Sequence, residues 1–103
     1  MNVRWSERAA LELAETVAYI VKEFGHQAAI KMRERINDAI SSLVTFPYMG
    51  KKSFTDEETS VVFYELADKQ SSIIYTIFED EIFIVSVWNN RQDRMRLQAF
   101  LSE

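Results

Sequence analysis

Residues 71–91, with the sequence SSIIYTIFEDEIFIVSVWNNR, contain two apolar runs separated by three acidic residues. The runs, 71–78 and 82–88, are rich in isoleucine, valine, phenylalanine and tyrosine, which favour the backbone of a strand. A connection as short as Glu79-Asp80-Glu81 joins two strands as a hairpin. Both alternating sets of side chains in the second run are largely apolar. We therefore expect its strand to be central in a sheet or covered on both faces.

A third apolar run, residues 61–66, lies just before this hairpin and has the same strand-like composition. Residues 67–70, the sequence ADKQ, separate it from the next run and are typical of a tight turn. The three runs therefore predict an antiparallel meander. Further upstream, residues 46–50 break the apolar pattern with a proline and a glycine, and residues 51–60 are polar and charged. We expect residues 51–60 to be an exposed connection.

The first half of the chain has the apolar spacing of two amphipathic helices. Ser6 is a good helix N-cap, and Gly25 favours a helix end. Apolar residues recur every three or four positions on both sides of Gly25; they are Ala9, Leu13, Val17, Ile20, Val21 and Phe24, then Ala29, Met32, Ile36, Ile40 and Leu43. Two helices joined almost without a loop favour an antiparallel hairpin whose apolar stripes share one core.

The two ends of the chain add a short element each. Residues 1–5 suit a strand, and residues 91–101 suit a terminal helix whose apolar positions are Met95, Leu97, Phe100 and Leu101. The predicted fold class is α+β, with residues 1–103 as a single domain. It has an N-terminal strand, an antiparallel helical hairpin packed on a three- to four-stranded antiparallel sheet, and a short C-terminal helix.

Composition and charge exclude several classes of protein. The chain has no cysteine, and we find no His/Cys/Asp cluster with metal-ligand spacing and no glycine-rich phosphate loop, so we expect neither metal nor cofactor. No segment approaches the roughly 20 apolar residues of a membrane span, and Glu7 and Glu12 interrupt any signal peptide, so we expect a cytoplasmic protein without a membrane partner. The net charge of −4 argues against direct nucleic-acid binding by the chain alone.

Several residue groups occur in a joint order and spacing that covers essentially the whole chain. They are Val3-Arg4-Trp5, Tyr19-Ile20, Phe24-Gly25, then Ile36, Ile40, Leu43, Pro47 and Gly50, and finally Tyr75-Thr76-Ile77, Ile82 to Val85 and Val87 to Arg91. The chain resembles the RelE/ParE superfamily, nearer its ParE branch. The resemblance implies the toxin component of a bacterial type II toxin–antitoxin system, with roles in plasmid stabilisation and growth inhibition. It also implies a cognate antitoxin protein as partner.

The cellular target depends on how this sequence departs from the superfamily pattern. RelE-type enzymes cleave messenger RNA on the ribosome with Lys and Arg residues assisted by His or Tyr. Here Ser72 stands where the family often has Arg, and Asn89 stands where many members have His. RNA cleavage needs a proton acceptor, a proton donor and cations. ParE-like members instead bind DNA gyrase, so we expect a gyrase-directed toxin that is not an enzyme.

Two other interpretations stay open. One is a ribosome-dependent messenger RNA endonuclease with Arg91, Lys51 and Lys52 as its catalytic candidates. The other is an inactivated toxin fold that only binds a partner, suggested by the acidic charge. Each candidate residue also has an ordinary structural explanation: Lys51 and Lys52 as an exposed loop pair, and Arg91 as an ion-pair partner of Asp93 or of a carboxylate at the sheet edge.

The candidate contact residues fall into two sets. The end of the last strand predicts the target-binding residues Asn89, Asn90, Arg91 and Arg94. Plausible exposed apolar residues for a groove that binds the antitoxin are Tyr19, Tyr48, Met49 and Phe54. We assign no role to the single histidine, His26, at the corner between the helices. Trp5 and Trp88 are expected to anchor the core or its rim.

Overall fold

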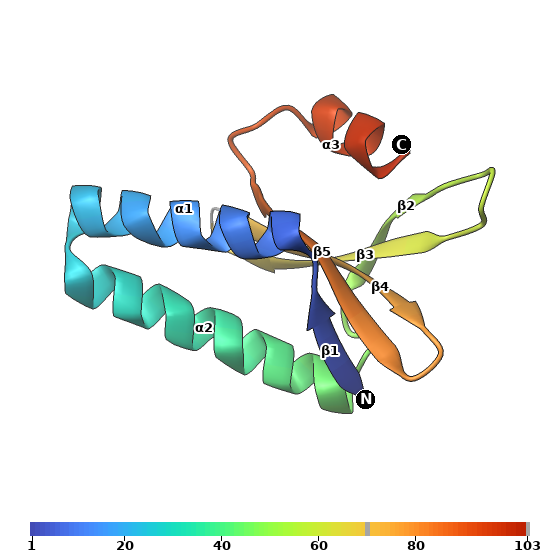
Figure 1. The fold of residues 1–103 in the computed structure, drawn as a ribbon, viewed down its shortest axis with the longest axis horizontal. Helices are drawn as coiled ribbons and strands as arrows, with labels where there is room; N and C mark the ends of the chain where they lie inside the picture. Colours follow the sequence, from blue (N-terminus) through green and yellow to red (C-terminus); the bar gives the residue numbers. More distant parts are fainter. Residues whose placement is uncertain (70, 103) are drawn as a thin grey trace.

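The computed structural model describes residues 1–69 and 71–102 and confirms the predicted α+β fold (Figure 1). Gln70, expected in a turn, lies outside the described residues. In chain order the elements are β1 (Asn2–Trp5), α1 (Glu7–Phe24), α2 (His26–Thr45), β2 (Lys51–Thr55), β3 (Val62–Asp68), β4 (Ser71–Phe78), β5 (Glu81–Asn89) and α3 (Arg94–Leu101). Among the described residues, the search for a helix long and apolar enough to cross a membrane finds none.

The sheet has five strands, where the sequence predicted three or four, in the order β1-β5-β4-β3-β2. Strands β2 to β5 are antiparallel, which confirms the predicted meander, whereas β1 pairs with β5 in parallel, Val3 opposite Ile82. The prediction of an exposed connection over residues 51–60 was wrong for its first half, because Lys51–Thr55 forms the edge strand β2. Edge strands often carry lysine, which discourages pairing with other chains and makes them read as polar loops.

The two predicted helices form a hairpin around a single glycine. Ser6 caps α1, since its side-chain oxygen accepts a hydrogen bond from the Ala9 amide at 2.9 Å. Gly25 has a φ of +92°, a conformation that residues other than glycine rarely adopt. It is both the C-cap of α1 and the N-cap of α2. This shared residue makes the connection so short that the two helices lie side by side (Figure 1).

Two apolar clusters lie on opposite faces of the sheet. Ala9, Ile36 and Leu43 from the helical hairpin pack with Ile73 and Tyr75 of β4 in the main core. Side chains alternate along a strand, so Ile74 points the other way, and there it packs with Trp88 and with Leu97 and Leu101 of α3. Met95 was expected on the apolar side of the last helix, but its side chain is 75% exposed.

The loop between α2 and β2 is fastened by one buried tyrosine. The Tyr75 hydroxyl donates a hydrogen bond to the Pro47 carbonyl and accepts one from the Gly50 amide, both at 2.9 Å. Gly50 fits because it has no side chain: a Cβ there would lie 2.5 Å from the Tyr75 hydroxyl oxygen. The loop therefore depends on this glycine and this tyrosine together.

Glu12 of α1 accepts hydrogen bonds from the part of β5 that does not pair with β1. Strand β1 pairs with β5 only as far as Ile84, and beyond that point α1 lies against the strand. Glu12 Oε1 accepts hydrogen bonds from the buried Ser86 hydroxyl at 2.7 Å and from the Val87 amide at 3.1 Å. A buried hydrogen-bond donor that has no acceptor lowers the stability of the folded chain. Glu12 therefore fastens α1 to the sheet.

Replacing Glu12 with alanine leaves the Ser86 hydroxyl and the Val87 amide without this acceptor. We expect the free energy of unfolding to fall by about 1 to 3 kcal/mol. Urea denaturation followed by circular dichroism measures the change. Glu15→Ala is the matched control, because Glu15 lies on the same helix with an exposed side chain. Equal losses in the two variants would contradict the proposed role of Glu12.

Candidate functional site

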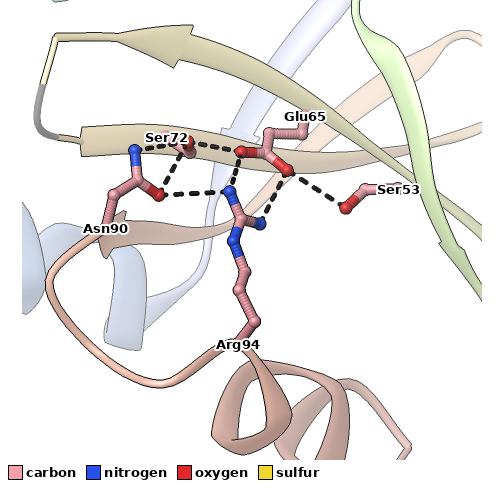
Figure 2. A network of polar contacts seen from close by, with 5 residues as sticks. All are labelled: Ser53, Glu65, Ser72, Asn90 and Arg94. Carbon is pink, nitrogen blue, oxygen red and sulfur yellow. Dashed lines mark hydrogen bonds and ion pairs between the residues drawn. The ribbon is translucent and has the colours of Figure 1, made fainter.

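A network of polar side chains connects α3 to strands β2, β3 and β4 and to Asn90, the residue after β5 (Figure 2). Its centre is Glu65 of β3, which is only 8% exposed. Arg94, the first residue of α3, donates to both carboxylate oxygens, at 2.8 Å from Nη1 and at 2.5 Å from Nη2. Ser53 of β2 adds a hydrogen bond to Glu65 Oε1 at 3.1 Å. This geometry is a two-pronged ion pair, the strongest kind of charged hydrogen bond between side chains.

Ser72 and Asn90 complete the network. Ser72 has one hydroxyl hydrogen, and the nearest acceptor is the ionised Glu65 Oε2 at 2.6 Å. The Ser72 oxygen then accepts from Asn90 Nδ2 at 3.0 Å, while Arg94 Nη2 donates to Asn90 Oδ1 at 3.3 Å. Donors and acceptors thus close a ring of Glu65, Ser72, Asn90 and Arg94 (Figure 2).

The ion pair shifts the protonation equilibria of both its members. The hydrogen bond from Arg94 lowers the pKa of Glu65 from 4.5 to about 2, against the opposing effect of burial and with help from Ser72 and Ser53. The hydrogen bond to Glu65 raises the pKa of Arg94. Both groups are therefore charged at neutral pH, and they neutralise each other. The guanidinium of Arg94 is engaged inside the molecule.

The other two predicted target-binding residues, Asn89 and Arg91, line a cleft of about 320 Å³ beside the helical hairpin. Its apolar wall comes from α1 and α2 and includes Tyr19, Phe24 and Met32. Arg91 Nη1 donates to the Tyr19 hydroxyl oxygen at 3.4 Å. Asn90 and Arg94 thus belong to the network, and Asn89 and Arg91 belong to the cleft.

The cleft is lined by four cationic side chains, although the chain as a whole is acidic. They are Lys31, Arg35, Lys69 and Arg91. Among the described residues, Asp68 is the one carboxylate in the lining, and Arg35 Nε lies 3.0 Å from its Oδ1. This pair joins α2 to the end of β3. The cleft therefore combines an apolar wall with a net positive rim.

The three predicted catalytic candidates do not come together. Lys51 and Lys52 lie exposed on β2, at the opposite side of the sheet from the strand that leads to Arg91. Three strand spacings separate β2 from β5, which is roughly 14 Å between backbones. The lysine pair and Arg91 therefore belong to different parts of the sheet.

The four predicted antitoxin-binding residues lie in three places. Tyr19 is 42% exposed and lines the cleft. Tyr48 and Met49 are exposed in the loop after α2. Phe54 was expected to be exposed, but it is half-buried and packs against Phe63 with ring centroids 6.1 Å apart. Of the four, Tyr19 lines the cleft, together with residues of both helices.

Trp5, Trp88 and His26 are the remaining residues for which the sequence predicted a location. Trp88 is buried in the cluster under α3, and Trp5 is half-buried at the edge of the main core, as expected. The Trp88 indole nitrogen has no hydrogen-bond partner among the described residues. His26 begins α2 with an exposed side chain. Within residues 1–69 and 71–102, no group of three or more His, Cys, Asp or Glu side chains is placed to hold a metal ion.

The sequence reasoning missed Glu65, Lys31 and Lys69 as parts of these sites. Glu65 did carry a signal, since it is a single charge inside the apolar run of β3, and buried carboxylates are almost always paired. The run does not say which cation supplies the partner. Lys31 and Lys69 look like ordinary surface lysines in the sequence, and only the packing of α2 beside the end of β3 brings them to one cleft.

Comparisons with known proteins agree on one family. A family model described as the ParE toxin of the type II toxin–antitoxin system, parDE, matches residues 3–94. Among solved structures, the chain is similar to one titled the chromosomal ParDE TA system from P. aeruginosa, with 23% identity and a TM-score of 0.67. The match covers 86% of this chain and 95% of that chain, and at this identity it shows the fold. No curated protein matches the chain.

Proposed function

Because this chain belongs to the ParE toxin family of type II toxin–antitoxin systems, we propose that it inhibits growth by binding DNA gyrase in the cytoplasm. A cognate antitoxin neutralises it by covering part of its surface. The chain acts by binding its target, and this action requires no proton transfer. Its contact surface is the end of β5, with Asn89 and Arg91 as the residues that touch the target.

The single observation that carries this proposal is the ion pair of Arg94 with Glu65. RNA cleavage requires cations that stabilise the pentavalent phosphate, together with a proton acceptor and a proton donor. Arg94 is held by a carboxylate instead, and Ser72 and Asn90 fill the rest of that corner with neutral hydrogen bonds. Because these side chains are paired with one another, they are not available to stabilise a phosphate, which supports a binding protein over a nuclease.

A supercoiling assay tests the target. Purified chain added to gyrase and relaxed plasmid is expected to inhibit supercoiling, and Arg91→Ala is expected to need at least tenfold more protein, roughly 1.4 kcal/mol of binding free energy. Arg96→Ala is the matched control, because Arg96 is exposed on α3 and lies outside the cleft and the network. Unchanged supercoiling at high excess, together with codon-positioned cuts in translated messages, would establish the nuclease instead.

Growth experiments test whether the chain is a toxin at all. Induction of the chain alone is expected to stop growth, and co-expression of its antitoxin is expected to restore it. The apolar cleft beside the helical hairpin supports the antitoxin part, since a segment that folds on binding needs an apolar groove of this kind. Normal growth on induction, with soluble folded protein present, would favour an inactivated toxin fold and contradict the proposal.

A further inference from the structure

We propose that the cleft beside the helical hairpin binds an apolar side chain that lies next to a carboxylate, and that the antitoxin supplies this pair. The identity of the partner rests on the proposed function. The chemistry of the occupant rests on the cleft alone. The cleft lies between α1, α2 and the ends of β3 and β5, and three of its properties support the proposal: size, apolar wall and charge.

The size and wall of the cleft fit one large side chain. Its volume of about 320 Å³ is at the lower end of the range for ligand pockets, which starts near roughly 300 Å³. The rings of Tyr19 and Phe24 pack edge to face with 6.5 Å between their centroids, and Phe24 is 63% exposed. Two large aromatic side chains left in solvent at one hollow indicate a surface that another chain covers.

The charge of the cleft specifies an anionic neighbour for that side chain. Four cations and one carboxylate line it, so its formal charge is +3, whereas the chain carries −4. The carboxylate, Asp68, is already held by Arg35. An uncharged partner would gain no charge–charge attraction from Lys31 and Lys69 at the rim. A carboxylate beside the apolar group would gain from both, and would also be steered toward the cleft.

A second hollow gives the bound segment a direction. It has a volume of about 280 Å³, shares Thr16, Tyr19 and Asn89 with the cleft, and is lined by the acidic residues Glu12 and Glu15. A carboxylate placed there would be repelled. The acidic part of the antitoxin segment therefore lies toward Lys31, and the part that follows α1 past Tyr19 toward Glu15 is neutral or basic.

A fragment experiment tests the chemistry without the partner. The probes are 3-phenylpropionate and its neutral counterpart 3-phenylpropanamide, added to the full chain and followed by amide NMR shifts. We expect the acid to bind with a dissociation constant on the order of a few millimolar, with shifts centred on Tyr19, Phe24 and Lys31. The amide is expected to bind at least fivefold more weakly. Equal affinities, or shifts centred away from the cleft, would overturn the proposal.

Charge reversal supplies the matched variants. Lys31→Glu is expected to weaken binding of the acid at least fivefold and to leave the amide unchanged. Lys22→Glu makes the same charge change on an exposed side chain outside the cleft lining, and it is expected to alter neither. If Lys22→Glu weakens the acid as much as Lys31→Glu does, the effect comes from net charge and the cleft has no specific role.

The antitoxin itself identifies the occupant. Calorimetric titration of the chain with its cognate antitoxin is expected to show at least tenfold weaker binding for Lys31→Glu and no change for Lys22→Glu. Equal affinity for the two variants would assign the cleft to another occupant and overturn the proposal. These readouts are separate from the supercoiling assay, so binding without gyrase inhibition rejects only the proposed target, and inhibition without a Lys31 effect rejects only this inference.

Discussion

Replacing Arg94 with alanine is expected to lower the free energy of unfolding by about 2 to 3 kcal/mol at pH 7. The loss follows from Glu65, whose carboxylate is 8% exposed and would be left without its cationic partner. Half of the Arg94 side chain reaches solvent, at 48% exposure, so the cost lies below that of a fully enclosed pair. Chemical denaturation at neutral pH measures the change, and the melting temperature should fall by roughly 10 °C.

Glu65→Gln is the matched control for Arg94→Ala. The glutamine keeps the shape of the side chain: its one amide oxygen can accept a hydrogen bond from Ser53 or Ser72, and its amide nitrogen can donate to the other serine, while Arg94 can turn toward water. We expect this variant to lose only about 1 kcal/mol. The Arg94→Ala/Glu65→Gln double variant should be more stable than Arg94→Ala alone, because it leaves no unpaired charge buried. A double variant with the summed loss would contradict the coupling.

The same ion pair sets how the stability responds to acid. The pKa of Glu65 is about 2 in the folded chain and 4.5 as its ordinary value, so the unfolded chain takes up the proton first as pH falls. Its contribution is fully present above about pH 4.5 and is lost between that pH and about 2. The lost stability amounts to at most about 3 kcal/mol. Glu65→Gln should lack this part of the acid response.

Gly50→Ala is expected to destabilise the chain by about 2 kcal/mol through overpacking. The new Cβ would lie 2.5 Å from the Tyr75 hydroxyl oxygen and 3.0 Å from the Glu65 carbonyl oxygen. Tyr75 is fully buried and its hydroxyl holds the Pro47 carbonyl, so the ring has no room to move aside. Either the loop after α2 shifts or the two hydrogen bonds of the hydroxyl break. Thermal unfolding of the variant measures the loss.

Tyr75→Phe distinguishes the clash from a general weakness of the loop. Removal of the hydroxyl costs the two hydrogen bonds, about 1 to 2 kcal/mol, but it also removes the atom that the alanine would meet first. The Gly50→Ala/Tyr75→Phe double variant should therefore lose less stability than the sum of the single losses. Strictly additive losses would show that the hydroxyl contact does not limit this position.

Most of the fold was predictable because it rests on local periodicity. The stripes on either side of Gly25, the Ser6 cap and the three apolar strands each leave a pattern within a few residues. Strand β2 leaves no such pattern, since two of its five residues are lysines. The parallel pairing of β1 is also invisible in sequence, because a strand of four residues carries no information about the direction of its neighbour.

The candidate site was less predictable because its residues are far apart in the chain. The sequence predicted Asn90 and Arg94 as target-binding residues; the structure places both in the polar network, where the partner of Arg94 lies 29 positions away in β3. The distance between Lys51 and Arg91 follows from the strand order, which a pattern of apolar residues does not contain. A single charge inside an apolar run can indicate that the charge is buried. Only tertiary packing determines which cation pairs with it.

The parallel pairing of β1 with β5 has a consequence for how a newly made chain matures. The Ser6 hydroxyl donates to the Val85 carbonyl across 79 positions, and β1 pairs with β5, so the first strand has no strand partner until residues 81–89 have been made. Pairing of such distant segments is slow, because the intervening chain must first be ordered. The sheet, and the cleft that residues 89 and 91 help to line, is therefore complete only after this late segment has been made.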